Sequence, residues 1–224
     1  NFEQYDLVVA PVLYMVKEGM AEALEGFVSC GGTLVTGFMS GIVDQSDNVY
    51  LGGYPGPLRK LAGIWVEEID ALAPEQRNTI AFKDGIKAEC RMLCDIIHLE
   101  KAEILAEYTS DFYAGTPAVT KNSFGEGNVY YVGTICDENA LSKILTVAVD
   151  DAKIAAVIDA ETELEITSRK TDNGRLYFLI NFKDESQKLP TQFAGEKDLI
   201  SNEILEEDTQ LKKYDVKIIF KKYA

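Results

Sequence analysis

The feature that most constrains the fold is a strand–helix–strand pattern at the start of the chain. The run YDLVVAPVLYMV, residues 5–16, is continuously apolar, which is typical of a strand that a parallel sheet buries on both faces. Residues 18–32 then have the apolar spacing of an amphipathic helix, and TLVTGFM, residues 33–39, predicts the next strand. Such a βαβ unit predicts an α/β domain with a right-handed crossover.

The chain from residue 79 onward predicts more strands, followed by a helix. Residues 79–108 have the pattern of strands separated by turns, and residues 117–135 have that of a hairpin around Gly125-Glu126-Gly127. Asp137 is suited to cap a last helix that runs to about residue 151. The intervening residues 40–63 are rich in glycine and proline, which predicts a long loop with a functional or interfacial role.

The pattern changes after residue 160. The stretch LEITSRKTDNGRLYFLINFKDESQKL alternates apolar and polar residues, with a hairpin turn at Asp172-Asn173-Gly174. KDLISNEI and YDVKIIFKKY predict further short strands. We therefore predict two domains, an α/β domain over residues 1–157 and a small antiparallel β-sandwich domain over residues 158–224.

Negative charge is concentrated in the first domain. The formal net charge is −15, and residues 1–160 carry −13 of it, with 24 acidic and 11 basic residues. A field of this sign repels phosphate backbones, which argues against nucleic acid as a partner. No apolar run reaches the roughly 18 residues that a membrane-spanning helix needs, and no basic amphipathic helix suggests a membrane surface. We predict neither nucleic acid nor membrane among the partners.

The cysteines and the single histidine favour neither a metal site nor a disulfide framework. Cys30, Cys90, Cys94 and Cys136 form no CxxC pair, and one histidine is too few to complete a zinc site easily. Free, mostly buried thiols in a reducing compartment are the favoured interpretation. We predict a cytoplasmic protein with no metal and no cofactor.

The sequence GFMSG, residues 37–41, has the form of a nucleophile elbow. A strand runs into G-x-x-x-G, the turn that lifts a serine or cysteine out of an α/β sheet, but the central residue is Met39. Ser40 is one position too late, so its side chain is expected to point elsewhere. We interpret Gly37, Met39 and Gly41 as a degenerate elbow without a nucleophile.

Other chemical candidates have simpler structural interpretations. His98 and Glu100 form an HxE pair like the one that orients the base in class I glutamine amidotransferases, but with no nucleophile a structural histidine is favoured. The glycines near residues 52–57 lack a Walker lysine, and the prolines among them remove backbone donors, so a shaped loop is favoured over a phosphate site. Glu67 and its acidic neighbours are interpreted as solvated or interfacial. We predict no catalytic residue.

The order of these motifs resembles the middle domain of family 42 β-galactosidases. The resemblance rests on YDLVVAPVLYMV, on FVSCGGTLVTGFMSGIVDQSDNVYLGGYPGPLRKLAGIWVEEIDAL and on AEILAEYTSDFYAGTPAVTKNSFGEGNVYYVGT, and residues 31–72 are its most distinctive block. It implies a trimerisation domain of the flavodoxin-like, class I glutamine-amidotransferase-like fold, followed by the small β domain that ends those enzymes. The family hydrolyses terminal β-D-galactosides with retention, using two glutamates on a (β/α)₈ barrel.

Two departures from the family pattern follow. Nothing in the chain corresponds to the barrel, so no glutamate here inherits a catalytic role, and a galactoside substrate is bound only through the missing barrel. Family members also have another strand and helix before YDLVVAP. If the chain begins at Asn1, we expect an open sheet edge or an exposed apolar patch beside residues 5–16.

The resemblance implies a role in assembly as a homotrimer. Closed trimers use a heterologous surface repeated around the ring, and aromatic residues and arginine favour interface cores. We predict that the long loop, with its flank taken as residues 42–65, supplies this surface, through apolar contacts of Tyr50, Leu51, Tyr54, Pro55, Leu58 and Trp65 and through Arg59 as a charged anchor. Packing of Leu58 and Trp65 into the domain's own core is the open alternative for these two. The alternative function is a free-standing amidotransferase-like domain with hydrolase or sugar-binding activity.

Overall fold

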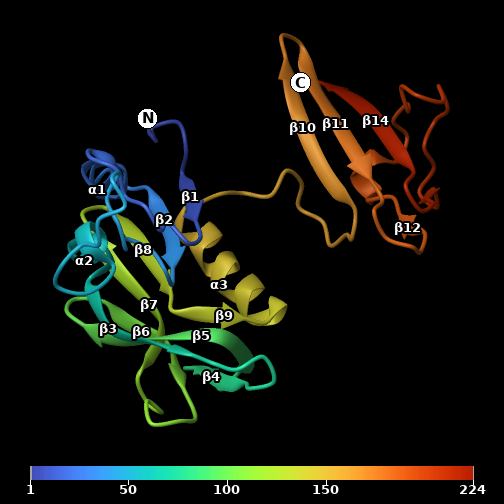
Figure 1. Ribbon diagram of the computed structural model, residues 1–224. Coiled ribbons are helices and arrows are strands. Elements are labelled where there is room, and N and C mark those ends of the chain that lie inside the picture. The colour runs from blue at the N-terminus through green and yellow to red at the C-terminus, as the bar shows by residue number, and fades with distance from the viewer. Residues whose placement is uncertain (1, 224) are drawn as a thin grey trace. The chain divides into compact units, whose positions relative to one another are not determined.

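The computed structural model describes residues 2–223, and the chain divides into two compact units with their boundary in the sequence between Ile154 and Ala155 (Figure 1). The first unit is an α/β domain and the second is an antiparallel β domain, each with a hydrophobic core of its own. The predicted fold class is therefore confirmed.

One nine-stranded sheet forms the centre of the first unit as described. Its path runs in the order β1-β2-β8-β7-β6-β4-β5-β3, and β9 pairs with β5 off this path. The strands are β1 (Leu7–Ala10), β2 (Thr33–Gly37), β3 (Ile64–Ala71), β4 (Asn78–Phe82), β5 (Lys87–Leu99), β6 (Glu103–Tyr108), β7 (Pro117–Phe124), β8 (Gly127–Val132) and β9 (Thr134–Cys136). The helices are α1 (Met20–Ser29), the short η1 (Gly56–Leu58), α2 (Arg59–Ala62) and α3 (Glu138–Asp151).

The sheet is mixed. β1 pairs with β2 in parallel, and β2 pairs with β8 in parallel, whereas the other pairings are antiparallel. The predicted βαβ unit is thus present, but the expected long strand over residues 5–16 is wrong because β1 ends at Ala10. Pro11 has no N–H to give to a neighbouring strand, and Val12 has a φ of 54°, which turns the chain out of the sheet.

Helices and core residues cover both faces of this sheet. α3 packs on one face through Ala140, Ile144 and Ala148, and α1 packs on the other through Leu24 and its neighbours. Asp137 caps α3 as predicted, because its Oδ1 accepts a hydrogen bond of 2.9 Å from the backbone N–H of Ala140.

The second unit contains two small antiparallel sheets. The larger consists of β10 (Glu165–Thr171), β11 (Gly174–Ile180) and β14 (Val216–Lys222), and the smaller of β12 (Gln187–Lys188) and β13 (Gln210–Leu211). A short helix, η2 (Thr191–Phe193), lies between β12 and β13 in the chain. The hairpin turn predicted at residues 172–174 is confirmed. KDLISNEI makes only isolated bridges instead of the expected strand, because its residues fold around a buried carboxylate.

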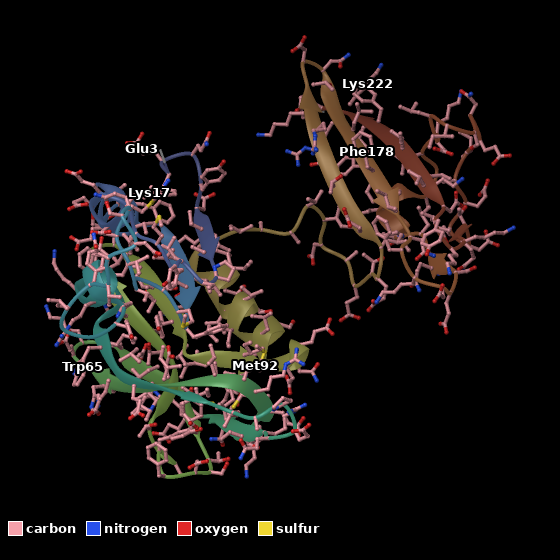
Figure 2. All side chains as sticks on the ribbon, viewed as in Figure 1. Glu3, Lys17, Trp65, Met92, Phe178 and Lys222 are labelled. Atoms are coloured by element: carbon pink, nitrogen blue, oxygen red, sulfur yellow. The ribbon has the colours of Figure 1, made fainter. Side chains whose placement is uncertain are left out.

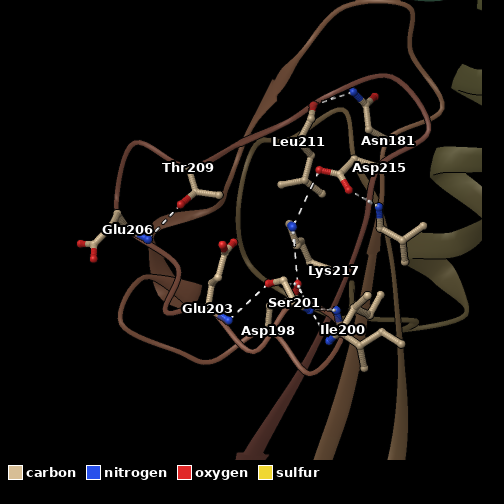
Figure 3. A network of polar contacts seen from close by, with 12 residues as sticks. Asn181, Asp198, Ile200, Ser201, Glu203, Glu206, Thr209, Leu211, Asp215 and Lys217 are labelled. Carbon is tan, nitrogen blue, oxygen red and sulfur yellow. Dashed lines mark hydrogen bonds and ion pairs between the residues drawn. The ribbon is translucent and has the colours of Figure 1, made fainter.

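That carboxylate belongs to Asp198, which is fully buried (Figure 3). It accepts hydrogen bonds from the backbone N–H groups of Ile200, Ser201 and Ile218 and from the Ser201 hydroxyl. The ammonium of Lys217 lies 3.4 Å away. Burial alone raises the pKa of Asp198, but these donors outweigh burial and hold the pKa at about 2. The loop is therefore organised by a buried negative charge.

Candidate assembly surface and degenerate elbow

The turn after β2 has the tight geometry that an elbow requires. A Cβ at Gly37 would lie 2.4 Å from the carbonyl oxygen of Val132, and one at Gly41 would lie 2.0 Å from that of Pro55, so both positions need glycine. Met39 lies between them with a φ of 56°, in the left-handed region that a non-glycine residue seldom adopts. The turn therefore presents a thioether where an elbow presents its nucleophile.

Ser40 supports the turn and is not available as a nucleophile. Its side chain is fully buried. The Oγ accepts a hydrogen bond of 3.0 Å from the backbone N–H of Leu13 and lies 2.9 Å from the Thr36 hydroxyl, which donates to the carbonyl of Ala10. These bonds fasten the segment after β1 to the end of β2.

His98 and Glu100 do not act as a pair. The His98 ring stacks on Trp65, with centroids 4.5 Å apart and an angle of 14° between the planes. Its Nε2 lies 2.7 Å from a carboxylate oxygen of Glu67, whereas the Glu100 carboxylate binds Arg59. No base and orienting acid are therefore assembled from the HxE motif.

The long loop is anchored at its base by its own side chains. The Tyr50 hydroxyl donates a hydrogen bond of 2.8 Å to the carbonyl of Val16. The backbone of Tyr54 pairs with that of Val66 on β3. Pro55 is buried, and Leu58 is only 1% exposed within the core beneath α1 and α2. For Leu58 the structure thus shows the core packing that the sequence left open.

The tip of the same loop is exposed and apolar. Leu51 is 96% exposed, and Val49 beside it is 56% exposed. The adjoining turn is held by Asp44, whose Oδ1 accepts the backbone N–H groups of Ser46 and Asn48. Hydrogen bonds from Asn48 lower the pKa of Asp44. The Leu51 side chain is therefore exposed to solvent on a loop whose adjoining turn is stabilised by hydrogen bonds.

Arg59 and Trp65 form a second part of this surface, on which Figure 2 labels Trp65. The Arg59 guanidinium lies 5.6 Å from the centre of the half-buried Trp65 ring. It donates to the Glu100 carboxylate, through Nε at 3.0 Å, and to the carbonyl of Gly52 at 3.2 Å. The bond to Arg59 lowers the pKa of Glu100. The arginine, at the start of α2, therefore connects the exposed tip to the residue that follows β5.

The edge of the sheet at β1 is open in the described part of the chain. β1 has a pairing partner on one side only, β2, and Val9 is 50% exposed. Beside it lies an apolar groove of about 380 Å³, lined in part by Val12, Phe38, Leu141 and Leu145. The structure thus has the exposed apolar patch that the sequence comparison led us to expect.

One buried group escaped the sequence reasoning. Asp95 on β5 is fully buried; its Oδ2 accepts a hydrogen bond of 2.7 Å from Tyr131, and its Oδ1 has no partner. Burial raises the pKa of Asp95 to about 7, against the effect of the Tyr131 bond. A charged residue inside the apolar run MLCDIIHL was the available signal.

The thiols are free, as predicted, and the described residues contain no group of three or more metal-binding side chains. Cys90 and Cys136 face each other across the β5–β9 pairing, and burial raises the pKa of Cys136 to about 12. Cys30 differs from the others because it is exposed. None of the described helices is long and apolar enough to cross a membrane.

The fold is that of an α/β domain built on a mixed sheet, joined to a small antiparallel β domain. The family model described as "Beta-galactosidase trimerisation domain" matches residues 1–155, and that described as "Beta-galactosidase C-terminal domain" matches residues 163–221. The chain therefore belongs to the family 42 β-galactosidases.

Individual relatives agree with this assignment. The β-galactosidase LacA of Lactobacillus acidophilus is 43% identical over 220 residues, which are 98% of this chain and 32% of that protein. The β-galactosidase BgaA of Planococcus sp. is 42% identical, over 99% of this chain and 33% of its own length. The chain thus spans about a third of the length of the curated relatives it matches.

Solved structures show the same relationship. The β-galactosidase from Bacillus circulans sp. alkalophilus has a TM-score of 0.89 at 38% identity, covering 97% of this chain and 33% of that one. The β-galactosidase from Rahnella sp. R3 has a TM-score of 0.86 at 36% identity, covering 99% of this chain and 33% of the other. The likeness extends over both units of the chain.

Proposed function

We propose that this chain is the assembly and C-terminal part of an enzyme that hydrolyses terminal β-D-galactosides with retention. The observation that carries the proposal is the match of both family models, combined with an elbow that holds Met39 in place of a nucleophile. Retaining hydrolysis needs two carboxyl groups roughly 5 Å apart across a sugar site. In the proposal these groups lie in the remaining two thirds of the enzyme.

Assembly proceeds through the tip and flank of the long loop, with a homotrimer as the product. The support is physical: Leu51 is 96% exposed at the tip of an anchored loop, next to the Arg59 and Trp65 pair. An exposed aliphatic residue beside an arginine and an aromatic ring has the composition of an interface centre. Since three copies must close a ring, this surface meets a different surface on the next copy.

Light scattering on the purified chain tests the assembly proposal. We expect trimers for the natural sequence and dissociation for Leu51→Ser, because the serine removes the apolar contact at the tip. Ile86→Ser is the matched control, since Ile86 is also an exposed aliphatic residue, at 50%, but lies in the turn between β4 and β5. A chain that is monomeric from micromolar to millimolar concentration, or a Leu51→Ser variant that remains trimeric, would contradict assembly through this loop.

A chromogenic β-galactoside tests the assignment of catalysis to the rest of the enzyme. We expect no turnover by the 224-residue chain, because it supplies only the assembly and C-terminal parts. Turnover that survives repurification would favour the alternative of a free-standing hydrolase.

We further propose a cytoplasmic location and no nucleic acid or membrane among the partners. The support is that Cys30, Cys90, Cys94 and Cys136 form no CxxC pair and that the net charge is −15.

A further inference from the structure

The larger sheet of the second unit has an apolar outer face. Cross-strand register places the side chains of this outer face in pairs on β11 and β14, and each side chain is partly exposed: Leu176 with Phe220, Phe178 with Ile218, and Ile180 with Val216. The alternate residues Leu179 and Ile219 point to the opposite side and are fully buried in the core of the unit. β11 and β14 therefore carry large apolar side chains on both faces.

Such a pattern is unusual for a sheet with water on one side. Antiparallel sheets that face water alternate apolar residues on the core side with polar residues on the other side. Here the polar residues of the outer face lie on β10, where Thr167 is the partner of Phe178, and at the end of β14, at Lys222. A contiguous apolar area of this kind marks an interaction site. The sheet therefore has the composition of one that is covered on both faces.

Two neighbouring features extend and shape the outer face. Leu199 is 48% exposed, and its N–H donates a hydrogen bond of 2.8 Å to the carbonyl of Ile218, which places it at the β14 edge. At the other end, a Cβ at Gly174 would lie 2.6 Å from the Phe220 ring. The glycine therefore gives Phe220 the room to lie along the sheet.

The outer face belongs to a basic sheet in an acidic chain. The three strands carry six basic residues and one acidic residue, Glu165, whereas the whole chain has a net charge of −15. Lys170, Arg175 and Lys221 lie side by side in register on the core side of the sheet, because they alternate along the strands with the residues of the outer face. Figure 2 labels Phe178 within this sheet and the basic Lys222 at its end. The charged side chains of the outer face are thus confined to its margin, at Glu165, Arg169 and Lys222, which leaves its centre apolar.

We infer that the outer face docks onto the part of a full-length β-galactosidase that lies outside these 224 residues, on a surface with an apolar centre. This inference rests on the proposed function. The remainder of the enzyme is available as the occupant, because the relatives carry about two thirds of their length beyond the region that this chain matches. The contact is separate from the loop around Leu51, and it attaches the C-terminal unit to the larger part of the enzyme.

Hydroxyl-radical footprinting with mass spectrometry tests this inference on intact proteins. The 224-residue chain is compared with the full-length β-galactosidase of L. acidophilus at the aligned positions of Phe178, Ile218 and Phe220. We expect oxidation to be at least about threefold slower in the full-length enzyme, because an interface core excludes water. Tyr214, which is 66% exposed in the same unit, is the control and is expected to react at similar rates in both proteins.

Three outcomes would overturn the inference. Equal oxidation of the outer face in the two proteins would show that the larger part of the enzyme leaves it open. Protection in the 224-residue chain that grows with concentration would assign the face to a second copy. Protection that does not depend on concentration would mean that the chain itself covers it. Light scattering on the same samples keeps the trimer proposal separate, since it can succeed or fail whatever the footprint shows.

Discussion

The two units each bury one aspartate completely, and they hold it in opposite ways. In the first unit Asp95 receives one hydrogen bond, from Tyr131, and burial raises its pKa to about 7. In the second unit burial acts in the same direction on Asp198, but donors such as the Ile218 N–H and the Ser201 hydroxyl bring its pKa to about 2 (Figure 3). Both carboxyl groups are buried, so the number of hydrogen-bond donors around each one decides whether its pKa is raised or lowered.

Secondary structure explains why the two carboxyl groups have different numbers of hydrogen-bond donors. Asp95 lies on β5, where backbone N–H groups are used by the sheet, as its own N–H is bonded to the carbonyl of Gly133. Asp198 lies in a loop, where the N–H groups of Ile200 and Ser201 are free to turn inward. Asp95 is therefore buried on a strand with its pKa raised to about 7, whereas Asp198 is buried in a loop with its pKa lowered to about 2.

The pH dependence of stability has the opposite sign in the two units. The raised pKa of Asp95 gives a contribution that is fully present below the unfolded value of 3.8 and lost as the pH rises through about 7. The lowered pKa of Asp198 gives a contribution that is present above 3.8 and lost as the pH falls through about 2.

Asp198→Ala is the strongest test of the comparison. We expect it to destabilise the second unit by about 3 kcal/mol, because several buried N–H donors lose their acceptor. Urea unfolding followed by hydrogen exchange in each unit measures the loss. Asp215→Asn is the control, since Asp215 is half-buried and its carboxylate accepts one backbone bond, from Val216. An equal loss in the control would contradict a special role for Asp198.

Asp95→Asn tests the other side of the comparison. At pH 8 we expect the first unit to gain about 2 kcal/mol, because the amide avoids a buried charge but leaves its own NH₂ unpaired. Well below the unfolded pKa of 3.8 the variant should be no more stable than the natural chain, since Asp95 is then protonated in both states. Unfolding curves measured across this range would refute the argument if the variant kept the natural slope between pH 4 and 7.

Lys217→Met should have the smallest effect. Its ammonium lies 3.4 Å from the Asp198 carboxylate, but the backbone and hydroxyl donors already satisfy that group. We expect a loss of about 0.5 kcal/mol in the second unit and an unchanged acid-unfolding midpoint. A loss as large as that of Asp198→Ala would mean that the ion pair, and not the loop, holds the charge.

The local parts of this fold were predictable from the sequence, and the long-range parts were not. The turn at Asp172-Asn173-Gly174 and the cap at Asp137 depend on neighbouring residues, so their signals are local. The pairing of β5 with β3, β4 and β9 depends on contacts between distant segments and has no local signal.

The candidate site divides along the same line. A missing nucleophile at Met39 is evident from the sequence alone. The sequence does not indicate which loop residues turn inward. Only the structure shows that Leu58 lies in the core and that Leu51 is exposed. The pKa of Asp95 also depends on its hydrogen-bond donor, which comes from a different strand.

The parallel pairing at the centre of the sheet has a consequence for synthesis. Thr33 on β2 pairs with Asn128 on β8, and the strands between them in the chain lie farther out in the sheet. As the chain leaves the ribosome, β2 can pair with β1, but its other edge waits until β8 has emerged, while the hairpin of β7 and β8 can form as soon as it is made. This edge of TLVTG is thus open to a chaperone bound to the nascent chain for most of the synthesis of the first unit.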